Sequence, residues 1–310
     1  MPSLVGAEMG IRDSYLRMSY ADLHKRIARV ANVLRSLGVS AGDTVAVLDW
    51  DSHRYLECLF AVPMLGAVLH TVNIRLSPEQ ILYTMNHAED KVVLIHEDFT
   101  PLVTNNLESI TTVSDWILLS DSRDFSDNSL PYIGEYETLL RKASSTYEFP
   151  DFDENTRATT FYTTGTTGVP KGVCFSHRQL VIHTFALTAA LAGSTHQGCF
   201  HSEDVYMPIT PMFHVHAWGM PYVATLLGVK QVYPGRYDPS KLIALIEEEG
   251  VTFSHCVPTI LHMLINFPGA GDSNFRGWKV IIGGSALSPT LARQALEKGI
   301  DVFGGYGMSE

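Results

Sequence analysis

Phe161–Gly172 reads FYTTGTTGVPKG and lies between two short β-runs. Residues 163–168 supply four threonine hydroxyls and two glycines, and Lys171 follows three residues later. Glycines let backbone N–H groups approach a polyanion closely, while hydroxyls and an ammonium group add further donors. The stretch therefore predicts a loop that binds a triphosphate.

Two other interpretations of this loop compete with triphosphate binding. A flexible Gly/Thr surface loop is the ordinary explanation of a short match, but the flanking β-runs and the terminal Pro-Lys-Gly argue against it. A Walker loop requires the pattern GxxxxGK[ST]. Gly165 and Gly168 are only three residues apart, and Lys171 is followed by Gly172, so the spacing excludes a Walker loop.

Composition narrows the classes of protein that remain. The 310 residues are 45% hydrophobic and 18% charged, which is typical of a globular protein. A net charge of −11 argues against nucleic-acid binding, which normally needs a basic surface. The four cysteines form no CxxC pair, so we expect reduced thiols and a cytoplasmic location. No signal peptide and no membrane span are expected, since long apolar runs are missing from the sequence.

Alternating helical and strand patterns predict an α/β fold with parallel-rich sheets flanked by helices. Apolar residues recur at helical spacing over 20–37, and Ser77-Pro78 reads as a helix start. A Ser-, Asp- and Pro-rich stretch at 121–157 predicts a boundary between a first subdomain, 1–157, and a second, 158–310. Further strands are expected at 44–48, 67–72, 91–96, 158–162, 172–175, 205–208, 230–233, 251–256 and 279–282.

Three further segments accompany the glycine-rich loop: MSYADL at 18–23, IIGGSALSP at 281–289 and GGYGMSE at 304–310. With YTTGTTGVPKGV at 162–173 they resemble, in order and spacing, the four motifs of the adenylate-forming (AMP-binding) superfamily. This superfamily includes acyl-CoA synthetases, luciferases and peptide-synthetase adenylation domains. The resemblance implies the large N-terminal domain of the acyl-CoA synthetase (luciferase-like) fold, incomplete at its C-terminus.

The resemblance implies a reaction in two steps. A carboxylate first attacks the α-phosphate of ATP, and the CoA thiol then attacks the acyl-adenylate. ATP, Mg²⁺ and CoA are therefore expected, with Thr163 and Glu310 near the metal, since Mg²⁺ favours oxygen ligands. By similarity the nucleotide-binding residues are Thr163, Thr164, Gly165, Thr166, Thr167, Gly168, Lys171, Gly283, Gly284, Ser285, Gly305, Tyr306, Gly307, Met308 and Ser309.

The segment PMFHVHAWGMPY at 211–222 indicates the substrate. His214 and His216 form an HxH pair, but no third metal ligand is apparent nearby, and a buried, hydrogen-bonded histidine is the ordinary alternative. The segment resembles that of fatty acyl-CoA synthetases, which places His214 and Val215 beside the acyl group and Trp218 at the mouth of an acyl tunnel. Trp218 read without the family is a core aromatic. The expected catalytic residues are Thr163, Lys171, His214 and Glu310.

A fatty acid–CoA ligase is the function that these motifs favour. An aryl-acid or amino-acid adenylate-former and a non-catalytic nucleotide-binding fragment remain as alternatives. The motif at 304–310 is followed in the family by a ribose-binding aspartate and a lysine-bearing C-terminal domain, so we expect weak or absent activity from this chain alone. The resemblance also allows a homodimer.

Overall fold

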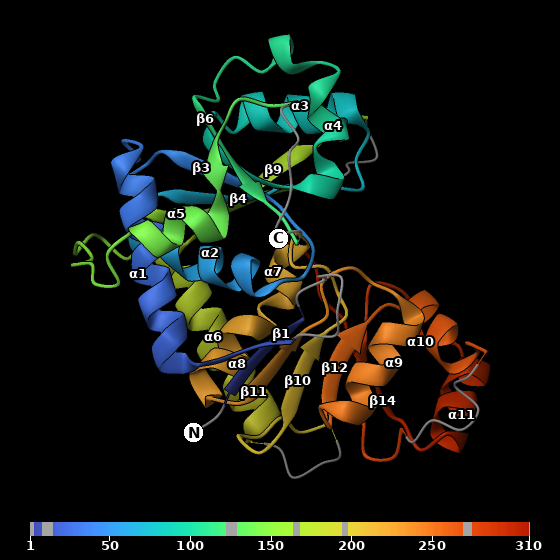
Figure 1. Ribbon diagram of the computed structural model, residues 1–310. Helices are drawn as coiled ribbons and strands as arrows, with labels where there is room; N and C mark the ends of the chain where they lie inside the picture. The colour runs from blue at the N-terminus through green and yellow to red at the C-terminus, as the bar shows by residue number, and fades with distance from the viewer. Residues whose placement is uncertain are drawn as a thin grey trace.

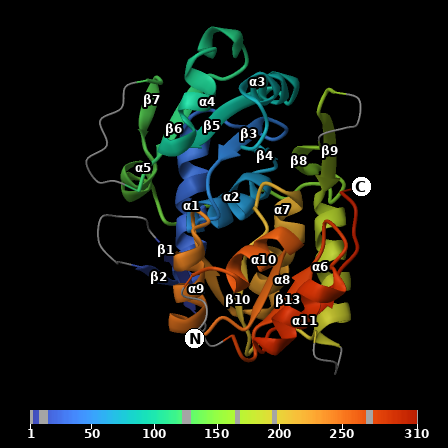
Figure 2. The ribbon, with the colours of Figure 1, turned by 90° about the vertical axis from the view of Figure 1, so that its right-hand side faces the viewer.

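Two seven-stranded sheets organise the chain, and both are mainly parallel. The structure is a computed structural model that describes residues 3–7, 15–121, 129–163, 168–193, 198–268 and 275–309. Sheet I has the order β7-β6-β5-β3-β4-β8-β9 and sheet II the order β14-β13-β12-β10-β11-β1-β2. Sheet I lies above sheet II in Figure 1, and Figure 2 shows the same pair turned by 90°.

The strands of sheet I are β3 (Thr44–Leu48), β4 (Val68–Thr71), β5 (Asp90–His96), β6 (Asp115–Leu119), β7 (Tyr132–Glu135), β8 (Arg157–Thr163) and β9 (Lys171–Ser176). Those of sheet II are β1 (Ser3–Ala7), β2 (Tyr15–Ser19), β10 (Val205–Pro208), β11 (Lys230–Tyr233), β12 (Phe253–Cys256), β13 (Lys279–Ile282) and β14 (Asp301–Gly304). Only β1–β2 and β8–β9 pair antiparallel within these sheets. The predicted α/β class is confirmed.

The helices are α1 (Tyr20–Ser36), α2 (His53–Met64), α3 (Pro78–His87), α4 (Pro101–Thr104), α5 (Tyr136–Lys142), α6 (His177–Ala192), α7 (Val215–Trp218), α8 (Met220–Leu227), α9 (Pro239–Glu248), α10 (Pro258–Ile265) and α11 (Pro289–Glu297). Two 3₁₀ turns lie at Glu97–Phe99 and Leu107–Ser109. Among the described residues, no helix has the length and apolar character needed to cross a lipid bilayer.

Local sequence explains why the helices begin where they do. Ser19 caps α1 through a reciprocal pair of hydrogen bonds with Asp22, and Ser77 forms the same arrangement with Gln80 at the start of α3. Pro78 occupies the first turn of α3, where a missing N–H costs no intrahelical bond. The predicted start at Ser77 is confirmed, and the helix predicted over 20–37 is present as α1.

Sheet membership crosses the boundary expected at residue 157. Strands β8 and β9 extend sheet I, whereas β1 and β2 lie in sheet II, where β1 pairs in parallel with β11. One buried cluster contains Val45 and Leu69 of sheet I together with Met212 and Tyr233. The segments 1–157 and 158–310 therefore do not each correspond to one sheet, and a shared core joins the two sheets.

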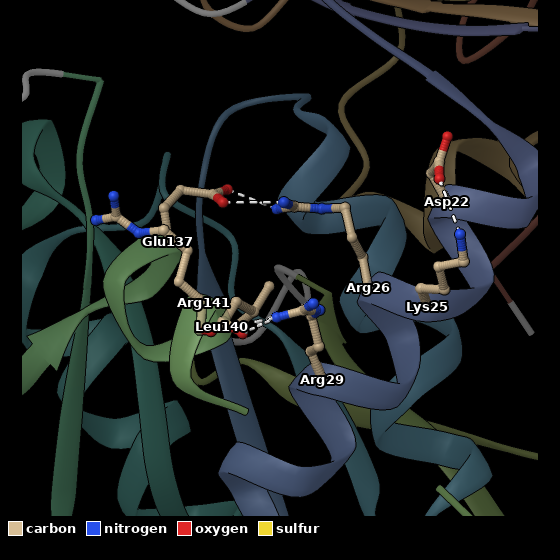
Figure 3. Close-up of a pocket in the computed structure, with 7 residues that line it drawn as sticks. All are labelled: Asp22, Lys25, Arg26, Arg29, Glu137, Leu140 and Arg141. Carbon is tan, nitrogen blue, oxygen red and sulfur yellow. Dashed lines mark hydrogen bonds and ion pairs between the residues drawn. The ribbon is translucent and has the colours of Figure 1, made fainter. Parts of the chain in front are cut away.

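An ion-pair network fastens α5 to α1 and α2 (Figure 3). Arg26 Nε donates to Glu57 Oε1 at 2.6 Å, and its two terminal nitrogens donate to Glu137 at 2.9 and 2.5 Å. Glu57 is 0% exposed and also accepts a 2.6 Å hydrogen bond from Tyr136. Arg29 donates to the carbonyl oxygens of Leu140 and Ala143.

This network lines a groove of about 360 Å³ between α1 and α5. Its remaining cations are also engaged, Lys25 with Asp22 and Arg141 with Thr138. Each cation that lines the groove has a protein partner, and we therefore interpret the groove as a structural junction between α1 and α5.

Replacing Arg26 by Ala should lower the free energy of unfolding by about 3–5 kcal/mol, because it leaves the Glu57 carboxylate buried without its cation. Urea unfolding measures the loss. The neighbouring Lys25→Ala removes an exposed cation and should change stability by less than about 0.5 kcal/mol. Equal losses in the two variants would contradict a buried ion pair at Glu57.

Candidate nucleotide and acyl site

The predicted phosphate loop is a hairpin between β8 and β9. Thr163 lies directly opposite Lys171 in this antiparallel pair, and Tyr162 lies opposite Gly172. Lys171 is exposed and Thr163 is half-buried. Gly168 has φ +92°, a backbone conformation that a residue with a Cβ rarely adopts. The hairpin therefore holds a hydroxyl and an ammonium group side by side, while Thr164, Gly165, Thr166 and Thr167 lie outside the described residues.

A buried polar network supports the base of this hairpin. The Tyr162 hydroxyl is 2.7 Å from His87 Nδ1, and its ring lies edge-on to His70 at 5.1 Å. His70 Nδ1 is 2.9 Å from an oxygen of Asp90, and both side chains are fully buried. A Cβ on Gly172 would lie 3.3 Å from the Tyr162 ring. The strand below the loop is thus fixed by contacts that its Gly/Thr pattern does not indicate.

The His214 loop is hydrogen-bonded to sheet I just before His214 itself. Met212 N–H donates to Asp51 Oδ1 at 2.8 Å, and the Thr71 hydroxyl donates to the Phe213 carbonyl at 3.2 Å. His214 is exposed. Partial desolvation and the positive charge of Arg75 lower the pKa of His214. A neutral imidazole at this position is able to accept or donate a hydrogen bond.

Residues 215–218, labelled α7, form a left-handed turn. Val215, His216, Ala217 and Trp218 have φ between +48° and +59°. For residues with a Cβ this conformation costs roughly 1–2 kcal/mol each. Gly219 continues the positive φ at +74°, and a Cβ there would lie 2.7 Å from the His183 ring. The segment is therefore strained and depends on its surroundings.

The left-handed turn separates the two histidines of the HxH pair. His216 is 1% exposed, and its ring lies against Phe161 at 5.7 Å and Tyr222 at 6.1 Å. Burial, with a smaller effect of His183, lowers its pKa to about 3. Within the described ranges, no group of three or more His, Cys, Asp or Glu side chains has a metal-binding arrangement. His216 is therefore a neutral, buried side chain, as the core-histidine alternative predicts, but its Nε2 has no hydrogen-bond partner among the described residues.

Trp218 bridges the acyl segment and the glycine turn. Its ring is 4.9 Å from that of His255, and a Cβ on Gly283 would lie 2.8 Å from its Cη2. His255 is fully buried, its Nε2 is 2.8 Å from the Tyr206 hydroxyl, and burial lowers its pKa to about 3. Only a residue without a side chain fits at 283 while the indole keeps this place.

The predicted adenine-side residues meet at the carboxyl ends of β13 and β14, the edge at which open parallel sheets bind ligands. Gly305 N–H donates to the Ile282 carbonyl at 2.7 Å, which brings the motif at 304–310 beside Gly283 and Gly284. Gly284 has φ +76°. Ser285, Gly305 and Gly307 are exposed, Ser309 is half-buried, and Tyr306 and Met308 are 93% and 68% exposed.

The segments at 281–285 and 304–309 lie side by side in the structure, and comparison with known proteins supports the family resemblance. The profile of the AMP-binding enzyme family matches residues 3–310. The chain belongs to the AMP-binding enzyme family. A long-chain-fatty-acid–CoA ligase of Thermus thermophilus is 41% identical over 298 residues, 95% of this chain and 52% of the relative. A medium-chain-fatty-acid–CoA ligase of Ectopseudomonas oleovorans is 36% identical, and the match covers 95% of this chain and 54% of the relative.

Solved structures show the same fold. The N-terminal domain of FACL13 from Mycobacterium tuberculosis superposes with a TM-score of 0.79 at 26% identity, over 95% of this chain and 70% of that one. A long-chain-fatty-acid–CoA ligase (FadD1) from Archaeoglobus fulgidus superposes with a TM-score of 0.82 at 20% identity. The match covers 99% of this chain and 61% of that one. The AMP-binding chain spans about half the length of the curated relatives it matches.

Metal binding has only partial support among the described residues. Thr163 supplies one oxygen donor at the hairpin, and Glu310, the other predicted ligand, lies outside the described residues. One hydroxyl does not hold Mg²⁺, which demands near-octahedral oxygen coordination.

Sequence reasoning missed the residues that support the site. Asp51, Thr71 and His255 were not singled out, although each lies at or near the carboxyl end of a strand, the side of the sheet where ligands bind. Asp51 lies three residues after β3, and Thr71 is the last residue of β4. Polar residues at strand ends were the available signal.

Gly283→Ala should displace the Trp218 indole, since the added methyl group would lie 2.8 Å from Trp218 Cη2. The indole ¹⁵N–¹H resonance of Trp218 reports the displacement. Gly307→Ala is the matched control, because a Cβ there has nothing within 4 Å. An unchanged Trp218 resonance in the Gly283 variant would contradict this packing.

Acidification should expose the cost of burying His216. Its pKa in the folded chain is about 3, below the ordinary 6.5, so the unfolded chain takes up a proton first as the pH falls. The contribution of neutral His216 to the free energy of unfolding is complete above about pH 6.5 and is lost as the pH falls toward 3. The free energy of unfolding should fall more between about pH 7 and pH 5 in the wild type than in His216→Asn, which has no titrating ring. Parallel curves in urea unfolding would refute it.

Proposed function

We propose that this AMP-binding chain activates a fatty acid as its acyl-adenylate, as part of an ATP-dependent acid–CoA ligase. One observation carries the proposal: the turn at 214–218 connects the two halves of the nucleotide site. His216 packs on Phe161, two residues before Thr163, and Trp218 packs on Gly283. A carboxylate held at His214 therefore lies between the groups assigned to phosphates and those assigned to adenine.

The residues suit the chemistry of the first step. Attack of a carboxylate on the α-phosphate expels pyrophosphate, and charge accumulates on phosphate oxygens. Preorganised donors that meet this charge lower the barrier. Lys171 and the threonine hydroxyls supply such donors at the hairpin, and His214 supplies a hydrogen-bonding imidazole at the carboxylate. Mg²⁺, when bound, would neutralise polyphosphate charge, and by the family resemblance Thr163 and Glu310 would hold it.

The fatty-acid assignment rests on the acyl segment and on the relatives. Val215, Trp218 and their neighbours offer apolar contact, and each buried methylene contributes about 0.8 kcal/mol. Two of the relatives above are named as fatty-acid–CoA ligases. Other relatives, 36% and 35% identical, are named as 3-methylmercaptopropionyl-CoA ligases. A short acyl chain with a thioether is therefore the second candidate substrate.

Location and assembly complete the proposal. All four cysteines, Cys58, Cys174, Cys199 and Cys256, are free thiols, which supports a cytoplasmic location. CoA as the acceptor in the second step, and a homodimer, rest on the family resemblance alone. The division into subdomains at residue 157 also stays a prediction.

Binding of octanoyl-sulfamoyl-adenosine, a stable mimic of the acyl-adenylate, tests the site on this chain by calorimetry. We expect binding that weakens about tenfold or more in His214→Ala, since a hydrogen bond to a charged group is worth about 1.5–3 kcal/mol. His262→Ala, an exposed histidine on α10, should bind as the wild type does. Tighter binding of the aryl or aminoacyl mimics would overturn the fatty-acid assignment, and no binding of any mimic would overturn the function.

A further inference from the structure

Asp51 occupies the junction between the two sheets. It lies between β3 and α2 and is only 3% exposed. One carboxylate oxygen accepts the Met212 N–H at 2.8 Å, and the other accepts the Tyr237 hydroxyl. Its backbone carbonyl accepts the Gly235 N–H at 2.8 Å. Three groups from the segments that follow β10 and β11 of sheet II thus converge on one residue that follows β3, the central strand of sheet I.

Stability does not explain a carboxyl group at this place. Among the described residues, none places a cation within ion-pair distance of Asp51, and a buried carboxylate without such a partner is costly. Burial, followed by the like charge of Asp49, raises the pKa of Asp51 to about 7, while Tyr237, Met212 N–H and Arg75 oppose the rise. Tyr55, Tyr206 and Tyr233 also face it electrostatically. Burial therefore opposes the charge of this carboxyl group, and its hydrogen bonds need an explanation other than ion pairing.

Asp51 is hydrogen-bonded to the segment that leads into the strained left-handed turn at 215–218. Met212 lies two residues before His214 and three before the left-handed turn. On the far side of the turn, His216 and Trp218 are fixed by aromatic packing. On the near side, the main chain of 212–213 is held by two hydrogen bonds: Met212 N–H donates to Asp51, and the Phe213 carbonyl accepts from the Thr71 hydroxyl. The exposed imidazole of His214 gains its position from these main-chain anchors.

We propose that Asp51 is a positioning residue: through Met212 N–H it holds the strained turn so that His214 faces the acyl carboxylate. This role rests on the proposed function, because it assigns His214 to the acyl group. What Asp51 supplies is an acceptor for Met212 N–H, and its negative charge is dispensable. Asparagine keeps a carbonyl acceptor for Met212 and offers an amide donor to the Tyr237 oxygen. Alanine offers neither.

Hydrogen exchange at the Met212 amide tests the anchor directly. Exchange in Asp51→Ala should be about tenfold faster or more, the equivalent of one lost hydrogen bond, and should return to wild-type values in Asp51→Asn. Tyr237→Phe keeps the Met212 bond and should exchange as the wild type does. Asp204→Ala is the matched control, a buried carboxylate bound to Lys279 and Thr252 away from the turn. It should leave Met212 exchange unchanged.

Affinity for octanoyl-sulfamoyl-adenosine tests the consequence for the site. It should fall about tenfold in Asp51→Ala, as for loss of His214, and recover in Asp51→Asn, while Asp204→Ala matches the wild type. Equal Met212 exchange in the wild type and Asp51→Ala would overturn the proposal, as would equal losses of affinity in Asp51→Asn or Asp204→Ala. If the wild type binds no mimic, the proposed function fails, and Met212 exchange alone then decides whether Asp51 holds the turn.

Discussion

Two hydrogen bonds between the sheets, from Met212 N–H to Asp51 and from the Thr71 hydroxyl to the Phe213 carbonyl, set the geometry of everything assembled around the acyl segment. They join the main chain of the segment after β10 to one side chain that follows β3 and one at the end of β4. The left-handed turn, the exposed His214 and the Trp218 contact with Gly283 all follow within seven residues of them. Because main-chain hydrogen bonds fix direction as well as distance, a small shift here would move the whole segment.

The site that results combines a dry interior with an open rim. His216 and His255 lie in apolar surroundings that favour their neutral forms. Lys171, Ser285, Tyr306 and His214 are exposed around them. A preorganised interior keeps the turn from relaxing, and the rim leaves charged and polar groups free to meet an anionic ligand. A buried interior and an exposed polar rim are consistent with membership of the AMP-binding enzyme family.

Sequence patterns predicted what depends on local chemistry. The phosphate hairpin, the starts of α1 and α3, and most strands were visible because capping, turn composition and periodicity act over a few residues. The order of strands in the sheets could not be predicted, since no local pattern near Ser3–Ala7 indicates that this strand pairs with β11. Neither was the left-handed turn, because Val215, His216 and Ala217 have no intrinsic preference for it. Asp51 was missed because its partners are remote in sequence, and the loop residues 164–167 lie outside the described residues.

The position of the first strand has a consequence for synthesis on the ribosome. Strand β1 lies between β2 and β11, so it gains its parallel partner only after residue 233 has been translated, and sheet II is complete only with β14, which ends at Gly304. Sheet I needs nothing beyond β9, which ends at Ser176. Long-range pairing is slow, and an unpaired strand edge exposed meanwhile invites association with other chains. All strands of sheet I are therefore translated before β11, and the pair β1–β2 meanwhile has an unpaired edge that a chaperone could cover.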